Sequence, residues 1–370
     1  MRILLFPAAL GLFTATALAQ SPTPTPSERP TLNRPGAPAA SPTPSPSPSQ
    51  SGNPAPAVEA GQPGSQAEDS KPGYPDLIHR FDYDSHSGLD VRNVNIEKRG
   101  DVMLIEINYS GASDDRVPAY LVLPHGGGDH PAIIWGHWLK KGSPLANKDE
   151  FLEEALVLAR AGVVSVLVDA PQARHDFPPL ASDLLEGVKQ RSEAAEHQVI
   201  DLRRAVDLLL VRKDVDRRRI AYVGHSWDAH IGAILAGVET RICCYVLMAS
   251  GYSDEEDVFA SPDDPTRKQL GDDVVRQYFR DYAFDDPGHF IGHTDRESIF
   301  LQFGMYDYVK RDRAQHYLSL FSSKDKQMQF YESGHELDSA ARLDRVRWLQ
   351  KHLGFKKVDE KELQAIPPLK

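Results

Sequence analysis

The sequence predicts an α/β fold in which a mostly parallel sheet of eight strands is covered by helices on both faces. Three observations carry this prediction. Segments 91–97, 102–109 and 117–123 alternate apolar with polar side chains, as antiparallel strands do. From residue 132 onward, short apolar runs alternate with longer segments of helical period, which is typical of parallel strands joined by helices. Hydrophobic residues make up 41% of the chain and charged residues 26%, as in an ordinary globular protein.

The alternation of strand and helix begins with a short buried run at 132–135. A helix over 150–161 follows and ends at Gly162, a natural C-terminal stop, before the strongly apolar strand 163–168. A long amphipathic helix is expected at 193–211. Residues 252–297 fit no strand–helix unit, and we expect them to form a small lid-like excursion over the carboxyl edge of the sheet. Further strands are predicted at 219–223, 242–248, 299–303 and 327–331, with helices at 229–238 and 339–353.

The first 74 residues differ from the rest of the chain. A basic start and an apolar stretch over 3–18 lead into Ala17-Leu18-Ala19, which has the small-x-small form after which signal peptidase cuts, so residues 1–19 are predicted to be a signal peptide. The alternative, a retained membrane anchor, is disfavoured because the stretch is shorter than the ~20 residues that a spanning helix needs. Residues 20–74 are rich in Pro, Ser and Thr and are expected to form a disordered linker before the folded domain, 75–370.

Charge and cysteine content narrow the possible partners. Residues 1–74 carry four basic and four acidic side chains, so the folded part holds the whole net charge of −11. An acidic domain repels phosphate backbones, which argues against nucleic acid as a partner. The two cysteines, Cys243 and Cys244, are neighbours and would form only a strained disulfide. No Cys/His spacing resembles a metal site, so we expect neither metal nor cofactor.

The most informative stretch is 219–228, in which a buried strand runs into Gly224-His225-Ser226 and a helix begins at once. Such a sharp strand-to-helix turn lifts a serine hydroxyl above the edge of the sheet. A nucleophilic serine needs a base, and the base needs an orienting acid. Asp307 follows one predicted strand and His335 follows the last, which gives the chain order Ser, Asp, His.

Counted from the strand at 102–109, Ser226 follows the fifth strand, Asp307 the seventh and His335 the eighth. In this order the chain resembles the α/β hydrolases, and in detail the bacterial dienelactone-hydrolase and acetyl-xylan-esterase-like branch, over roughly residues 90 to 355. The resemblance implies that Ser226 attacks an ester carbonyl, that His335 acts as general base and acid, and that Asp307 orients the imidazole. Each residue also has a plainer interpretation, as a turn serine, a loop histidine or a turn-forming aspartate, and Asp254 is a rival for the acid.

An oxyanion site is expected from the backbone N–H of Trp227 together with an amide from the loop after the 132–135 strand, either His137 or Trp138. Segment 125–128 looks like an oxyanion motif but precedes that strand, and we interpret it as a hairpin turn. Trp138 and Trp227 are predicted to form an aromatic wall for an acyl group or a sugar ring. His137, like His225 and His230, is more typical of a structural or pocket-lining residue than of a catalytic one.

Asp228 departs from the family pattern, which has a small residue, most often glycine, two places after the serine. A carboxylate ~6 Å from a developing oxyanion would oppose it by about 2–3 kcal/mol at an effective dielectric near 20. Alternatively, an acidic residue in the first turn of a helix is favoured by the helix dipole. Asp228 therefore leaves open a non-catalytic binding protein on the same scaffold.

These observations together predict an exported carboxylic-ester hydrolase that works through an acyl-enzyme intermediate. The substrate is expected to be a small-molecule or polysaccharide-linked ester, and the mature chain a monomer, secreted or periplasmic, without a membrane span. A serine peptidase of similar fold is the second alternative. Tests of peptide amides against esters would separate the two activities.

Overall fold

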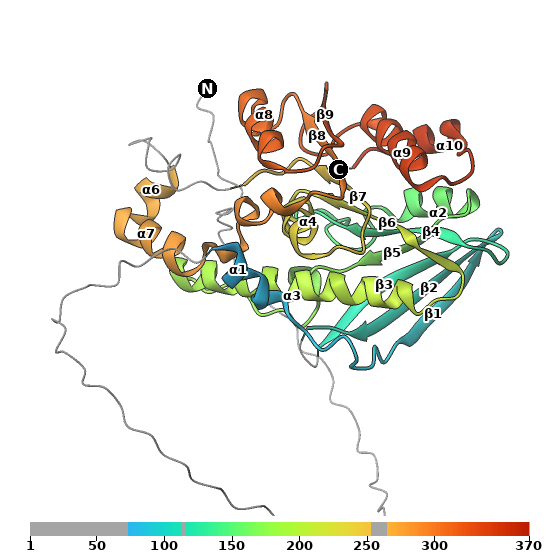
Figure 1. Ribbon diagram of the computed structural model, residues 1–370, viewed down its shortest axis with the longest axis horizontal. Helices are drawn as coiled ribbons and strands as arrows, with labels where there is room; N and C mark the ends of the chain where they lie inside the picture. The colour runs from blue at the N-terminus through green and yellow to red at the C-terminus, as the bar shows by residue number, and fades with distance from the viewer. Residues whose placement is uncertain (1–72, 113–114, 253–264, 370) are drawn as a thin grey trace, which may run out of the picture. The chain divides into compact units, whose positions relative to one another are not determined.

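The computed structural model describes residues 73–112, 115–252 and 265–369 (Figure 1). The predicted signal peptide, and the predicted linker up to residue 72, lie outside these residues. Helix α1 (Tyr74–Leu77) begins at the last residue of that predicted linker. Within the described part of the chain, no helix combines the length and the apolar character needed to cross a membrane.

The sheet confirms the predicted α/β-hydrolase fold class but has nine strands rather than eight. The ninth strand, β1 (Arg92–Arg99), corresponds to the strand predicted at 91–97, which the count of eight left out, and it pairs antiparallel with β2 at one edge. The β2–β3 and β3–β5 pairs are also antiparallel, and all pairs from β5 onward are parallel. The strand order is β1-β2-β3-β5-β4-β6-β7-β8-β9. The other strands are β2 (Val102–Ser110), β3 (Arg116–Leu123), β4 (His130–Gly136), β5 (Val164–Val168), β6 (Val215–His225), β7 (Cys244–Met248), β8 (Ser298–Gly304) and β9 (Lys326–Tyr331).

Segment 125–128 connects β3 to β4, and our interpretation of it as a hairpin turn was wrong. β3 pairs with β5, and β4 lies on the far side of β5, so the two strands that this segment joins are not neighbours. The pattern of glycines marks a loop correctly, but it carries no information about which strands pair, because pairing is decided by the whole sheet.

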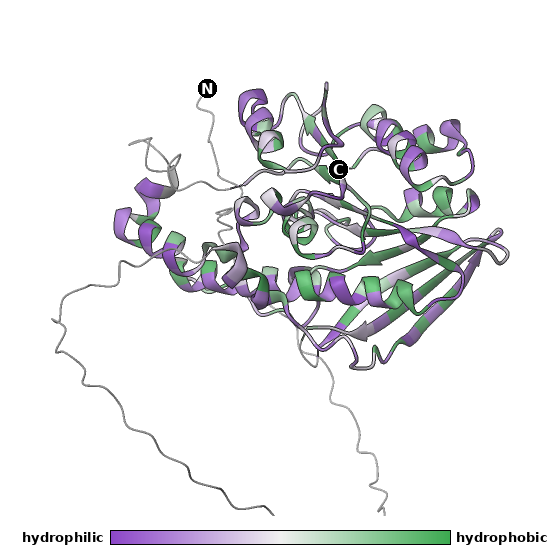
Figure 2. Cartoon of the chain, in the orientation of Figure 1, coloured by the Kyte–Doolittle hydropathy of each residue, from purple (hydrophilic) through white to green (hydrophobic). Residues whose placement is uncertain are grey.

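Helices cover both faces of the sheet (Figure 1). Side chains from α3 (Leu184–Leu210), α4 (Trp227–Val238) and α8 (Arg311–Leu320) join one hydrophobic cluster, and those from α2 (Leu152–Arg160), α9 (Ser339–Leu353) and α10 (Glu360–Ala365) join the other. The central strands supply both, since Ile134 packs into the first cluster and Ile133 into the second. These strands are hydrophobic along most of their length (Figure 2), as strands buried on both faces must be.

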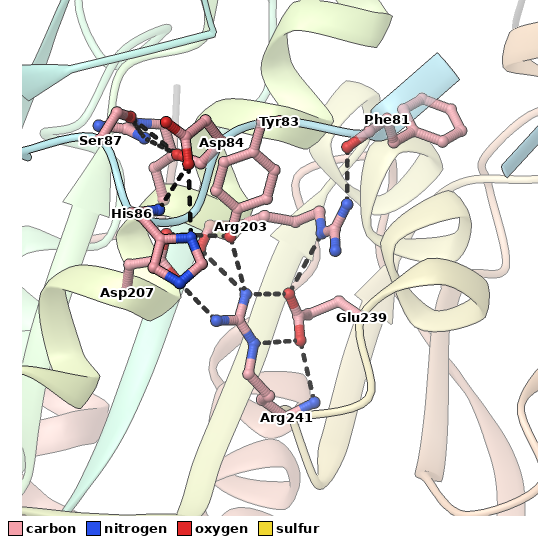
Figure 3. A network of polar contacts seen from close by, with 10 residues as sticks. Phe81, Tyr83, Asp84, His86, Ser87, Arg203, Asp207, Glu239 and Arg241 are labelled. Carbon is pink, nitrogen blue, oxygen red and sulfur yellow. Dashed lines mark hydrogen bonds and ion pairs between the residues drawn. The ribbon is translucent and has the colours of Figure 1, made fainter. Parts of the chain in front are cut away.

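The segment before the sheet is held by a polar network (Figure 3). After α1 comes the 3-10 turn η1 (Ile78–Phe81), whose last carbonyl accepts a hydrogen bond of 2.6 Å from Arg203. Arg241 binds Asp207 at 2.5 Å and the buried carboxylate of Glu239 at 2.5 Å and 2.7 Å. Arg241 also donates to the Tyr83 hydroxyl at 3.1 Å, so residues 158 positions apart are joined at one end of α3 and α4.

Of the predicted excursion, 252–297, the structure describes residue 252 and residues 265–297. It contains α6 (Pro265–Leu270), α7 (Asp272–Asp281) and three 3-10 turns, η3 (Ala283–Asp285), η4 (Pro287–His289) and η5 (Ile291–His293). Phe290, between the last two turns, packs so closely on α4 that a Cβ at Gly237 would lie 2.4 Å from its carbonyl oxygen. A further 3-10 turn, η2 (Pro171–Ala173), follows β5. A lid role for 252–297 stays a prediction.

Candidate active site

Ser226 occupies the turn between β6 and α4. Its backbone has φ 55° and ψ −110°, a conformation that L-residues rarely adopt. The N–H of Ser226 donates to the Met248 carbonyl at 2.8 Å, which holds the turn against the end of β7. Gly224 is required here, because a Cβ at that position would lie 2.3 Å from the carbonyl oxygen of Asp228. The surrounding contacts therefore impose the strained geometry that exposes the hydroxyl at the carboxyl edge of the sheet.

The structure brings Ser226, His335 and Asp307 together in one hydrogen-bonded chain. The Nε2 atom of His335 lies 2.7 Å from the Ser226 hydroxyl, and its Nδ1 atom lies 2.9 Å from Oδ2 of Asp307. The other carboxylate oxygen of Asp307 accepts the N–H of Tyr308 at 2.7 Å. Asp307 follows β8 and His335 follows β9, as the sequence predicted. Asp254, the rival acid, lies outside the described residues.

The loops that carry Asp307 and His335 are packed against each other at close range. A Cβ at Gly304 would come within 2.1 Å of the Gly334 carbonyl oxygen. The N–H of Tyr306 donates to the Ser333 carbonyl at 3.0 Å. The position of His335 relative to Asp307 is thus set by backbone contact as well as by the hydrogen bond between the two side chains.

Trp138 does not fill either of the two roles that we predicted for it, as an oxyanion amide and as an aromatic wall for substrate. Its backbone N–H donates to the Glu150 carboxylate at 2.6 Å, so this amide is not available to an oxyanion. Its indole is only 1% exposed and donates to the Leu145 carbonyl at 3.2 Å, so it cannot form a wall for substrate. A buried carboxylate such as that of Glu150 must be hydrogen-bonded, and the Trp138 N–H is one of its donors. Both predictions for Trp138 are corrected on these grounds.

His137 keeps its place as the candidate amide from this loop. Its imidazole is fixed in the core, with Nδ1 2.7 Å from the Trp138 carbonyl and Nε2 accepting the Ala170 N–H at 2.9 Å. Burial lowers the pKa of this imidazole, which agrees with a neutral ring of one defined tautomer. The backbone N–H of His137 faces the carboxyl of Asp228 and lowers the pKa of that carboxyl, against the larger effect of burial.

Asp228 is completely buried, and it fits because its neighbour lacks a side chain. A Cβ at Gly136 would lie 2.5 Å from Oδ2 of Asp228, so glycine at 136 leaves the space that aspartate at 228 fills. The side-chain amide of Gln198 donates to Oδ1, while Oδ2 has no hydrogen-bond partner among the described residues. Burial raises the pKa of Asp228 well above its usual range, so we infer that the carboxyl is neutral.

Trp227 begins α4, where the first amides of a helix have no intrahelical acceptor, so its N–H is available. Its half-buried indole donates to the side-chain amide oxygen Oε1 of Gln198 at 2.7 Å and stacks on His230 at 5.6 Å between ring centroids. Burial lowers the pKa of His230 to about 4, which keeps this ring neutral, and its Nε2 donates to the Asp285 carbonyl at 2.8 Å. The predicted oxyanion and substrate roles of Trp227 stay predictions.

Sequence reasoning missed Glu150 and Gln198, two buried polar side chains beside the site. Gln198 lies inside a helix predicted from its apolar face, and Glu150 is the first residue of another predicted helix, where an acidic residue is ordinary. Neither residue stands out by type or spacing. Their importance comes from partners distant in the sequence, which no local pattern reveals.

No family model matches the sequence, and a search of curated proteins gave no match. Solved structures do match. Acetyl xylan esterase 1 from a Thermoanaerobacterium species superposes with TM-score 0.61 at 15% identity, over 75% of this chain and 93% of that one. An acetyl xylan esterase from a Paenibacillus species gives 0.55 at 16%, over 76% and 93%. The glucuronoyl esterase of Solibacter usitatus gives 0.50 at 12%, over 78% and 91%. These likenesses show that the chain has the α/β-hydrolase fold.

Proposed function

We propose that this protein is a serine hydrolase that cleaves carboxylic esters through an acyl-enzyme intermediate. The observation that carries the proposal is the hydrogen-bonded chain from Ser226 through His335 to Asp307, with distances of 2.7 Å and 2.9 Å. A hydroxyl, an imidazole and a buried carboxylate in this order form the arrangement that activates a serine for acyl transfer.

In the proposed reaction the Ser226 hydroxyl oxygen bonds to the ester carbonyl carbon, and its proton passes to Nε2 of His335. Asp307 stabilises the resulting imidazolium. The carbonyl oxygen becomes an oxyanion, which the backbone N–H groups of Trp227 and His137 stabilise. Collapse breaks the bond to the alcohol, which leaves with the proton from His335. A water molecule then attacks the acyl carbonyl carbon while His335 takes its proton. The bond to Ser226 breaks, His335 returns the proton to the serine oxygen, and the carboxylic acid is released.

The state of Asp228 favours an enzyme over a non-catalytic binding protein. The sequence raised the concern that a charge beside the oxyanion would oppose its formation. A neutral carboxyl brings no such charge, and the glycine at 136 leaves room for the Asp228 side chain. Before the oxyanion forms, the His137 N–H faces this carboxyl. We propose that the substrate oxygen competes for that N–H as negative charge develops.

The fold neighbours point to the class of ester. Their names describe esterases that act on acetyl xylan and on glucuronoyl esters. We propose for this chain an ester that is either a small molecule or linked to a polysaccharide. The half-exposed Trp227 is the candidate surface for its acyl group or sugar ring. We further propose that the protein is secreted or periplasmic and that it acts as a monomer.

The experiment that tests the function is covalent labelling of the protein from Gln20 onward with a fluorophosphonate probe. We expect wild type to label, Ser226→Ala not to label, and Asp307→Asn to label at least about 10²-fold more slowly because the imidazole loses its orientation. Asp254→Asn serves as the matched control and should label like wild type. Absence of labelling in wild type, with labelling gained in Asp228→Gly, would instead support a scaffold silenced by Asp228.

A second assay separates the esterase from the peptidase alternative. Para-nitrophenyl acetate and an acetylated xylo-oligosaccharide are compared with a peptide para-nitroanilide. The esters should turn over in wild type and not in Ser226→Ala. Turnover of the anilide at a rate comparable to that of the esters would overturn the assignment as an esterase.

A further inference from the structure

A second buried pair lies directly behind His335. Nδ1 of His225 lies 2.5 Å from Oε1 of Glu150, and the two side chains are 1% and 0% exposed. The other oxygen of Glu150 accepts the Trp138 N–H at 2.6 Å. The pair joins the segment before α2 to the last residue of β6, next to Ser226. A polar pair with so little exposure carries a large desolvation cost, so it is weak evidence of a contribution to stability, and a second role is worth testing.

The far side of His225 reaches the loop of the proposed general base. Its Nε2 lies 2.8 Å from the backbone carbonyl oxygen of His335. Because a carbonyl oxygen only accepts, Nε2 must carry a hydrogen. A second proton then lies between Nδ1 and the carboxylate of Glu150, and the pair presents a fixed donor to His335. Glu150 sets the direction of this donor, as an outer carboxylate does for a metal-bound histidine.

Aromatic packing holds the same geometry. The indole of Trp138 stacks on His225 with ring centroids 5.1 Å apart and 22° between planes, and its centroid lies 6.5 Å from that of His335. The rings of His225 and His335 are 5.3 Å apart. Backbone hydrogen bonding and ring packing therefore both act on His335, the proposed base, which must be placed within about 0.5 Å for proton transfer.

We propose that Glu150 and His225 form a positioning pair, which holds the backbone of His335 so that its imidazole stays between Ser226 and Asp307. This inference rests on the function proposed above. Neither residue touches the reacting atoms. Their removal should lower kcat with little change in KM, since a misplaced base affects the chemical step more than substrate binding.

The test compares two substitutions of His225 whose side-chain amides replace different ring nitrogens. The side-chain amide of asparagine lies near the place of Nδ1, whereas that of glutamine reaches the place of Nε2. We expect His225→Asn to lower kcat for para-nitrophenyl acetate at least about tenfold with KM within about twofold. His225→Gln should restore kcat to within about threefold, because a donor to the His335 carbonyl is present again. Glu150→Gln should add nothing in the His225→Asn background, as expected of residues that act as one unit.

Glu154→Gln is the matched control. Glu154 lies four residues along from Glu150, and its carboxylate pairs with Arg345 with side-chain exposures of 3% and 6%. This variant should be less stable but should keep wild-type kcat per site titrated with fluorophosphonate. Wild-type kcat in His225→Asn, or an equal fall in Glu154→Gln, would show that the Glu150–His225 pair is merely structural.

A measurement without substrate keeps this inference apart from the proposed function. Imidazole ¹⁵N signals of His335, assigned by their loss in His335→Gln, should move in His225→Asn and stay in place in Glu154→Gln. Unmoved signals in His225→Asn would overturn the positioning role whatever the activity. Moved signals in a protein that hydrolyses no ester would uphold the pair and refute the esterase.

Discussion

Packing holds Ser226 in a backbone conformation, and Asp285 in a buried environment, that are unfavourable in the unfolded chain. Ser226 adopts positive φ at the elbow because β6, β7 and α4 meet there, not because serine prefers it. Asp285 is buried in η3, with Oδ1 unpartnered among the described residues. Burial raises its pKa to about 7, with Arg191 and Ser192 opposing the shift. Both residues store free energy that a substitution can release.

The backbone strain at Ser226 predicts a difference between two inactive variants. Ser226→Gly should unfold with a free energy about 1 kcal/mol higher than Ser226→Ala, because glycine adopts positive φ without steric cost. Urea denaturation of the two purified variants measures this difference. Equal stability, or a more stable Ser226→Ala, would mean that the elbow is unstrained.

Asp285 predicts a pH-dependent stability. In the unfolded chain its carboxyl loses its proton near pH 3.8, whereas in the folded protein it does so at about 7. The folded state therefore binds more protons between these values, and its stability falls as pH rises from 4 to 7. Asp285→Asn should be more stable than wild type at pH 8, by on the order of 2–4 kcal/mol, and nearly equal at pH 4. Thermal unfolding at both pH values measures the effect, and a difference independent of pH would contradict it.

At the scale of elements, the site depends on how closely the strand ends and loops approach each other. Glycines at 136, 224 and 304 face backbone or side-chain atoms at distances that a Cβ cannot share. They stand at or next to the carboxyl ends of β4, β6 and β8, which are parallel strands of one sheet, so the oxyanion loop, the elbow and the acid loop lie at the same edge. The order of strands β4, β6, β7, β8 and β9 explains why residues up to about 200 positions apart form one site.

Gly304→Ala should therefore affect activity more than overall fold. The added methyl must displace the 333–334 backbone, which carries His335, and such overpacking costs about 1–3 kcal/mol. We expect kcat to fall by at least about tenfold. Gly292→Ala is the control, since nothing lies within 4 Å of its added Cβ. Steady-state kinetics with parallel thermal unfolding would distinguish the two, and unchanged kcat in Gly304→Ala would count against a rigid coupling of the loops.

At the scale of the whole described domain, stability and chemistry depend on different regions. The two hydrophobic clusters lie on opposite faces of the sheet, and the site lies at the carboxyl ends of its central strands. The network of Figure 3 is remote from Ser226 and links the segment before β1 to α3 and to the end of α4. Glu239 in this network is 2% exposed, so its charge depends on Arg241 and Arg203.

Arg241→Met should lower the free energy of unfolding by about 2–4 kcal/mol, because the buried carboxylate of Glu239 loses its main partner. Ester hydrolysis per active site should not change. Arg92→Met removes an ion pair whose side chains are 64% and 53% exposed, and it should leave stability unchanged. Chemical denaturation and active-site titration test both statements, and an equal loss in the two variants would refute the argument from burial.

The sequence by itself determined the α/β-hydrolase class, the position of most strands and helices, and the three residues that the structure joins by hydrogen bonds. Periodicity and turn residues are local signals, and Ser226, Asp307 and His335 each follow a recognisable strand. Their catalytic roles stay a prediction. Only the tertiary structure decided the pairing of β3 with β5, the burial of Trp138, the raised pKa of Asp228 and the partners of Glu150. Each of these depends on atoms brought together from distant segments, because burial and hydrogen bonding belong to the packed chain and not to any stretch of it.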